Sequence, residues 1–339
     1  MATIDADAHV IESDETWRYI PNEKFRPFLI SPGAGRPQNW LIDGRVFNRG
    51  VNFDRNLPVD ICEMRDIKSR LKHMDQLDID VQVLYPSLFL RPLTARAEVE
   101  NAICRSYNRW LIDVCARGEG RLKWIAVVPV IDAASMVAEV EFAKANGACG
   151  VFMRGIEGER MITDPYFYPL YEEMSRLDLA VGVHVGNANP YVIDLVSQYN
   201  GGGSFWKFRI PIIGAFHSVI MSDVPTLFPK LRFHWAEAAA QWIPYVVKDF
   251  QRRWGAINRQ LPDNPLKEYR QFVSCQTDDD VDYVLRYSGE DNLVIGTDYG
   301  HNDQSTEIEA LRNLKSQGSI TPLQYEKITY NNAKELFAL

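Results

Sequence analysis

Eight short β-rich segments alternate with amphipathic helical patterns along almost the whole chain, and this alternation constrains the fold most strongly. The expected strands are Ile4–His9, Val81–Tyr85, Trp124–Val128, Gly150–Met153, Val181–Val185, Leu231–Glu237, Phe272–Cys275 and Leu293–Thr297. The expected helices are Ile67–Leu77, Ala97–Ala116, Ala134–Asn146, Tyr166–Leu177, Trp242–Arg253, Val281–Tyr287, Ser305–Ser316 and an extra C-terminal helix over Thr321–Leu336. Alternating βα units predict a parallel sheet, and eight of them close into a barrel. We therefore predict an α/β fold in which residues 1–339 form a single (β/α)8 TIM barrel.

Two stretches interrupt the alternation. Residues 26–58 are rich in Gly, Pro, Asn and aromatics, and Trp40–Phe47 predicts a hairpin with an Asp43-Gly44 turn. Because this insertion follows strand one, we expect it over the C-terminal face of the barrel as a lid or substrate wall. A purely structural or oligomer-contact role stays open. A second insertion, Asn187–Ile213, follows strand five, and its glycines 201–203 predict mobility beside the site.

Composition restricts the classes of function. The net charge is −8 and no Lys/Arg cluster is present, which argues against a nucleic-acid partner. No apolar run approaches the roughly 20 residues that span a membrane, and no signal-peptide pattern opens the chain. The five cysteines lack CxxC spacing and cannot all pair, which favours a reducing compartment. We expect a cytoplasmic enzyme with a small-molecule substrate and neither nucleic acid nor membrane as partner.

Metal-ligating residues stand at the C-terminal ends of four predicted strands. Strand one ends with Asp7 and His9, whose side chains share one face because strand side chains alternate. His184 ends strand five, Glu237 ends strand six and Asp298 follows strand eight. Catalytic groups of such barrels come from these strand ends. The pattern predicts a divalent-metal site.

The combination of Asp7-x-His9, His184 and Asp298 in Gly-Thr-Asp-Tyr resembles the amidohydrolase-related metal enzymes, a family that includes aminocarboxymuconate-semialdehyde decarboxylase. The segment 331–337 is similar to the closing helix of that family. The resemblance implies a distorted (β/α)8 barrel and one divalent metal ion held by Asp7, His9, His184 and Asp298. The decarboxylases carry a proton-handling histidine after strand six, whereas this chain has Glu237 near that position.

Further ligands raise the question of a second ion. Glu12 and His301 lie three residues beyond the first and last ligands and could hold a second ion together with Glu237. A carboxylate-rich, dinuclear site suits Fe or Mn. The alternative is a mononuclear Zn or Mn site, in which Glu12 caps the next segment while Glu237 and His301 orient ligands or move protons. We assign catalytic roles to Glu237, His301 and Asp298.

The Asp-x-His-x-x-Glu opening is similar to a subgroup that includes an oxygen-dependent 2-aminoisobutyrate hydroxylase and related dinuclear non-haem monooxygenases. The favoured expectation is therefore O2-dependent hydroxylation of a small carboxylate substrate. The first alternative is a mononuclear Zn/Mn decarboxylase or hydrolase. The second is a barrel subunit that partners a catalytic homologue, since two homologous barrels work together in the 2-aminoisobutyrate system. A homo- or hetero-oligomer is expected in each case.

Three further residues are candidates for substrate binding. Arg154, at the tip of strand four, suits a bidentate grip on a substrate carboxylate, with a salt bridge to a loop acid as the alternative. Tyr85 and Trp40 are expected to line the pocket, with simple packing as the alternative. His234 is interpreted as structural and is expected to face the helices, because strand alternation would turn it away from an inward Glu237.

Overall fold

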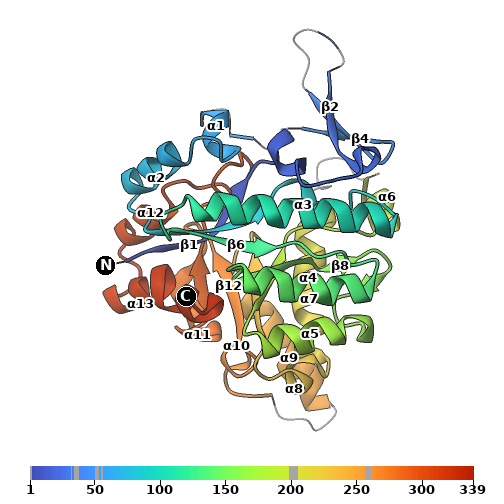
Figure 1. The fold of residues 1–339 in the computed structure, drawn as a ribbon. Helices are drawn as coiled ribbons and strands as arrows, with labels where there is room; N and C mark the ends of the chain where they lie inside the picture. Colours follow the sequence, from blue (N-terminus) through green and yellow to red (C-terminus); the bar gives the residue numbers. More distant parts are fainter. Residues whose placement is uncertain are drawn as a thin grey trace.

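A computed structural model describes residues 2–31, 33, 38–49, 53–54, 56–197, 205–256 and 261–339. It confirms the TIM barrel as a nearly closed, parallel sheet of eight strands (Figure 1). Their order is β1 (Ile4–Val10), β5 (Val81–Pro86), β6 (Leu122–Ala126), β7 (Gly150–Arg154), β10 (Ala180–His184), β11 (Arg232–Ala236), β12 (Gln271–Cys275) and β13 (Leu293–Ile295). The segment after β13 closes the ring on β1, since Asp298 N donates to Asp7 O at 2.9 Å and His9 N to Tyr299 O at 2.8 Å.

Helices pack around the outside of the barrel. The longer ones are α2 (Ile67–Gln76), α3 (Ala97–Ala116), α4 (Ala133–Ala145), α5 (Tyr168–Arg176), α6 (Pro190–Ser197), α7 (Ile210–Met221), α9 (Ile243–Ala256), α11 (Val281–Ser288) and α12 (Ala310–Ser316). Short helical segments are α1 (Val59–Cys62), α8 (Val224–Leu227), α10 (Pro265–Glu268), η1 (Asp14–Trp17), η2 (Glu23–Phe25), η3 (Leu88–Leu90), η4 (Pro165–Phe167) and a π-helical turn, η5 (Phe205–Arg209). Helix α12 begins five residues later than expected, because the segment from Ser305 folds back toward the barrel mouth, where the Thr306 hydroxyl donates to Asp298.

The C-terminal helix forms as expected but contains a π-helical turn. It comprises α13 (Pro322–Glu326), η6 (Lys327–Asn331) and α14 (Asn332–Phe337). Thr321 caps its start: the hydroxyl accepts Gln324 N, and the Gln324 side chain accepts Thr321 N. No helix in the described part of the chain is both long and apolar enough to cross a membrane.

The insertion after β1 forms a small antiparallel sheet of β2 (Phe28–Ile30), β3 (Asn39–Ile42) and β4 (Arg45–Asn48). Its predicted turn is present, with Asp43 and Gly44 both at positive φ, as a two-residue hairpin turn requires. The Asp43 carboxylate accepts from Thr94 Oγ1 at 2.5 Å and Arg96 Nε at 2.9 Å, which anchors the hairpin to the start of α3. In Figure 1, β4, α6 and the hairpin of β8 (Ile156–Glu157) and β9 (Arg160–Met161) gather toward the right-hand end of the barrel. Glycines 201–203, for which the sequence predicted mobility, lie outside the described residues.

Candidate metal centre

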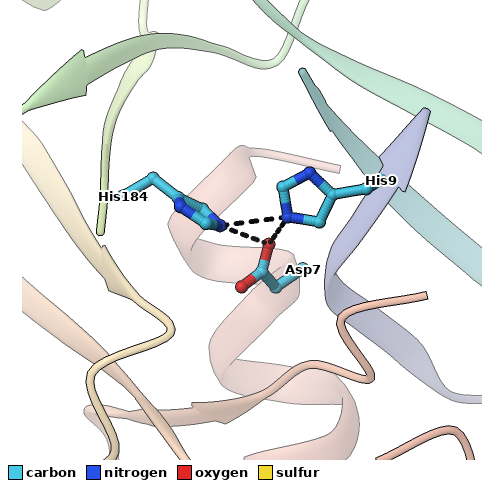
Figure 2. Close-up of side chains that lie close together, drawn as sticks. All are labelled: Asp7, His9 and His184. Carbon is cyan, nitrogen blue, oxygen red and sulfur yellow. Dashed lines mark hydrogen bonds and ion pairs between the residues drawn. The ribbon is translucent and has the colours of Figure 1, made fainter. Parts of the chain in front are cut away.

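Three predicted ligands converge inside the barrel mouth (Figure 2). Asp7 and His9 come from β1, and His184 is the last residue of β10. His9 Nε2 and His184 Nε2 lie 3.1 Å apart, while Asp7 Oδ1 lies 3.3 Å from His184 Nε2 and 3.6 Å from His9 Nε2. All three side chains are buried. Strand periodicity therefore predicted this convergence correctly.

The hydrogen bonds of the two imidazoles show why a cation belongs between them. His9 Nδ1 contacts the Pro86 carbonyl at 3.1 Å, and His184 Nδ1 contacts the Val185 carbonyl at 3.2 Å. Because carbonyls only accept, each Nδ1 carries the proton and each neutral Nε2 presents a lone pair to the other. Burial holds the pKa of His9 well below its usual value. Burial also opposes charge on His184, but Asp7, the Val185 carbonyl and Asp298 together outweigh burial and raise the pKa of His184. The pair needs a positive charge between the rings, either a proton or a metal ion.

Asp298 and His301 extend the cluster. Asp298 Oδ1 lies 3.3 Å from His9 Nε2 and 2.8 Å from His301 Nδ1. The Ser87 hydroxyl donates to Val10 O at 2.7 Å, so it accepts from His301 Nε2 at 2.7 Å and leaves Nδ1 bare.

The free donor atoms fit a divalent ion. Asp7 Oδ1, Asp298 Oδ1 and His301 Nδ1 are buried without hydrogen-bond partners among the described residues. Two ligands at about 2.1 Å from one ion lie about 3.0–3.4 Å apart. The separations of 3.1 Å between the two imidazole nitrogens and 3.3 Å from His184 to Asp7 fall within this spacing, and the 3.6 Å from His9 to Asp7 slightly exceeds it. Carboxylate oxygens and imidazole nitrogens suit Mn, Fe or Zn.

A second group of donors consists of Glu237, Asp298 and Asp303, whose carboxylate oxygens lie within 4.8 Å of one another. Glu237 stands one residue beyond β11, and its Oε2 lies 3.4 Å from His184 Nδ1. Burial, and then the carboxylates of Asp298 and Asp303, raise the pKa of Glu237 well above its usual value. Asp303 was not predicted from the sequence, although it follows Asp298 by only five residues in the same loop.

Glu12 lies apart from these donor groups. Its Oε1 accepts Ser87 N at 3.1 Å and its Oε2 accepts Leu88 N at 2.9 Å, and burial raises its pKa to about 7. The carboxylate thus caps the start of η3, which follows β5, whereas the capping alternative raised by the sequence placed it on the next segment after β1.

A second polar layer lies directly behind the donors. Asp5 Oδ1 accepts Thr297 N at 2.9 Å, and its Oδ2 accepts Thr297 Oγ1 at 2.6 Å and Gln82 Nε2 at 2.9 Å. Gln82 Oε1 in turn accepts Arg70 Nε at 2.7 Å, and the buried Arg70 guanidinium stacks 3.6 Å from the centroid of the Tyr299 ring. This layer joins β1, β5 and the segment after β13, and so fixes the strand ends that carry Asp7 and Asp298.

The predicted substrate residues have partners of their own. The Arg154 guanidinium binds Glu157 Oε2 through Nε at 2.9 Å and Nη2 at 2.5 Å, so its alternative, a salt bridge to a loop acid, is present. Tyr85 is fully buried, with its hydroxyl 2.7 Å from His234 Nδ1. Trp40 is buried edge-to-face against Trp17 with ring centroids 5.9 Å apart.

The predicted orientation of His234 was wrong. Its ring points into the barrel, where Nδ1 meets Tyr85 and Nε2 lies 2.8 Å from Ser274 Oγ. The neighbouring Trp235 packs against Phe216 of α7 instead. Glu237 lies beyond the strand at φ 64°, so strand alternation cannot be extended from it back to His234. The structural interpretation of His234 stays a prediction.

The fold and the donor cluster define a metal-dependent barrel enzyme. The sequence profile of the amidohydrolase family matches residues 4–339, and the chain belongs to this family. Among curated protein sequences, none matches the chain. An amidohydrolase from Mycobacterium avium subsp. paratuberculosis is similar in structure, with a TM-score of 0.84 at 19% identity over 100% of this chain and 98% of that one.

Two decarboxylases share the fold at greater distance. 5-Carboxyvanillate decarboxylase from Sphingomonas paucimobilis has a TM-score of 0.67 at 16% identity, covering 100% of this chain and 99% of its own. A dihydroxybenzoic acid decarboxylase from Polaromonas sp. JS666, solved with bound manganese and the inhibitor 2-nitroresorcinol, has a TM-score of 0.70 at 18% identity, covering 100% and 97%. At sequence identities of 16–19%, these structural similarities show only that the fold is shared.

Proposed function

We propose that the chain is a non-oxidative enzyme that decarboxylates a small carboxylate substrate at one divalent ion, Mn or Zn, held by Asp7, His9, His184 and Asp298. The observation that carries this proposal is the pair of bare imidazole nitrogens 3.1 Å apart, faced by an unpartnered buried carboxylate oxygen of Asp7. The two decarboxylases with this fold support the same chemistry. The proposal replaces O2-dependent hydroxylation as the favoured function.

Glu237 is suited to deliver the proton that decarboxylation needs. A bound divalent ion supplies Lewis acidity that polarises substrate oxygens. When the bond to the departing carboxylate breaks, its electron pair stays on the substrate carbon, which then takes a proton. Burial is the leading cause of the raised pKa of Glu237 and persists when an ion offsets the neighbouring carboxylates, so its carboxyl group can hold that proton. Water restores the proton after release of CO2.

A second candidate, the dinuclear O2-dependent hydroxylase, is favoured by one observation. Glu237, Asp298 and Asp303 place three carboxylate oxygens within 4.8 Å of one another beside the first donor group. Carboxylates of this kind bridge or bind a second Fe or Mn ion. The third candidate, a non-catalytic partner subunit, has less support because the donor set is complete.

The deciding experiment is elemental analysis of protein isolated without chelator or affinity-tag metal, combined with anaerobic CO2 release from a panel of hydroxybenzoates. We expect one equivalent of Mn or Zn and oxygen-independent turnover that a chelator abolishes. His184→Ala should lose both. His217→Ala is the matched control, because His217 pairs with Asp249 outside the barrel at 3.0 Å and should keep both. Two equivalents including Fe, with turnover only under O2, would establish the hydroxylase instead.

A further inference from the structure

The cavity beside the donor cluster is large. It measures about 900 Å³, near the upper end of the roughly 300–1,000 Å³ typical of ligand pockets. Glu237 and Asp303 line it and so connect it to the metal centre. Its other walls come from the β3–β4 hairpin, the loop after β5, the β8–β9 hairpin, α6 and η5. A one-ring acid would leave most of this volume empty.

Unpaired cations dominate the wall of this cavity. The basic side chains besides Arg154 are Arg45, Arg91, Arg160, Lys207 and Arg209. Among the residues that the structure describes, none of these five forms an ion pair. Arg209 Nη2 donates only to Ser305 Oγ at 2.7 Å, and Arg160 stacks 4.3 Å from the centroid of the Tyr166 ring. Arg91 has no hydrogen-bond partner in the described part of the chain.

The acids that line the cavity do not balance these cations. Glu157 is taken by Arg154, while Glu237 and Asp303 belong to the donor cluster. Burial raises the pKa of Glu100 to about 7, and its carboxylate already accepts Ile131 N at 2.8 Å. Asp194 is the remaining acid in the lining. The cavity wall thus carries positive charge although the whole chain has a net charge of −8, and the electrostatic potential in such a cleft attracts anions.

The free arginines fall into an inner and an outer pair. Arg91 also lines a small cavity of about 40 Å³ together with His301, a member of the donor cluster. Arg209 is close enough for its charge to work against the raised pKa of Glu237. Arg45 and Arg160 lie instead on β4 of the β3–β4 hairpin and β9 of the β8–β9 hairpin, and the labelled strands β4 and β8 lie toward the same end of the barrel in Figure 1.

We propose that this cavity binds an elongated substrate with two anionic groups, an inference that rests on the proposed function. Arg91 and Arg209 hold the carboxylate that reacts, and Arg45 and Arg160 hold a second carboxylate or phosphate at the outer end. Arginine suits both places because its guanidinium binds such groups bidentately. Arg154 then holds Glu157 in the wall of the pocket and does not bind the substrate.

The test compares two probes with the same biphenyl skeleton by titration calorimetry on the metal-loaded enzyme: biphenyl-4,4′-dicarboxylate and biphenyl-4-carboxylate. We expect the dianion to bind at least tenfold more tightly. Arg45→Gln and Arg160→Gln should each remove most of that advantage and leave the affinity for the monoanion unchanged. Arg91→Gln should weaken both probes. Arg176→Gln, on the outer surface of α5, is the control and should change neither.

Equal affinity for the two probes, or binding of neither, overturns the proposal. A loss of affinity for both probes in Arg160→Gln also overturns it, since it would place that arginine at the same group as Arg91. The readout is binding and not turnover. A negative result in this binding test therefore does not contradict metal-dependent decarboxylation. Conversely, the absence of metal-dependent turnover would not contradict a measured preference for the dianion.

Discussion

Two buried polar layers stacked in the barrel differ in how their atoms are satisfied. In the layer behind the metal centre, both carboxylate oxygens of Asp5 accept hydrogen bonds from Thr297, Gln82 or Asp7 N. In the layer at the mouth, Asp7 Oδ1 and Asp298 Oδ1 have no donor within the described residues. Buried polar groups are normally paired, so the unsatisfied layer indicates a cation site, while the satisfied layer indicates a structural role.

The two layers come from the same segments of chain. Asp5 and Asp7 are both on β1, while Thr297 and Asp298 are adjacent after β13. Asp5, whose hydrogen bonds are satisfied, therefore positions Asp7 two residues further along β1, and Thr297 positions the adjacent Asp298. The barrel stabilises the metal centre in this way: hydrogen bonds in one layer offset the repulsion between donors in the next.

The largest expected effect comes from making the same substitution, Asp to Asn, once in each layer. Asp5→Asn disturbs the buried hydrogen bonds from Thr297 and Gln82 and removes a carboxylate charge that acts on the buried Arg70, so it should lower the free energy of unfolding of the metal-free protein by about 3 kcal/mol at pH 8. Part of this loss is offset. Burial raises the pKa of Asp5 to about 6, so at pH 8 the folded protein bears the cost of a buried charge that asparagine does not carry. Asp7→Asn should leave that free energy unchanged or higher, since its amide can donate to a bare imidazole nitrogen. Urea denaturation measures both.

Metal affinity should reverse the order of the two variants. Asp7→Asn removes a charged ligand and should weaken Mn binding at least 100-fold, whereas Asp5→Asn should weaken it about 10–100-fold through misplaced ligands. Equal destabilisation of the metal-free protein by both variants would show that the two layers do not differ as argued.

A second, smaller effect concerns pH. Burial raises the pKa of Glu12 from 4.5 to about 7, so the folded protein holds a proton there that the unfolded chain releases. This contribution to stability is complete below about pH 4.5 and is lost as the pH rises through 7. From pH 5 to pH 7 it should fall by about 2 kcal/mol. Metal-free Glu12→Gln should lack this part of the pH dependence in urea denaturation. An unchanged slope would contradict the burial argument.

The barrel and its first ligands could be predicted because local rules determine them. Strand periodicity places Asp7 and His9 on one face, and parallel strands bring their C-terminal ends, including His184 and Asp298, to one mouth. The Asp43-Gly44 turn was predictable for the same reason, since a two-residue hairpin turn needs positive φ at both positions.

The remaining site residues depend on loops and long-range contacts that a single sequence does not encode locally. Glu12 turns to backbone N–H groups that follow β5, some 75 residues away. Asp303 reaches the donors through an irregular loop. His234 faces inward because it pairs in register with Gly182 of β10, two residues before the inward His184, and the positive φ of Glu237 hides this alternation from the sequence. The Arg154–Glu157 pair is the exception, since a salt bridge from Arg154 to a loop acid was one of the two alternatives that the sequence left open.

The smallest expected effect tests how tightly the two layers are stacked. A Cβ at Gly296 would lie 2.3 Å from Asp7 Cβ, so Gly296→Ala must push β1 and the segment after β13 apart. We expect a loss of about 1–2 kcal/mol in unfolding free energy, with Mn binding about tenfold weaker because Asp7 shifts. Gly214→Ala is the matched control: its Cβ meets nothing within 4 Å in the middle of α7, and alanine there should stabilise the helix by about 0.5–1 kcal/mol. If Gly296→Ala bound Mn as tightly as Gly214→Ala, the spacing of the layers would not be what sets the position of Asp7.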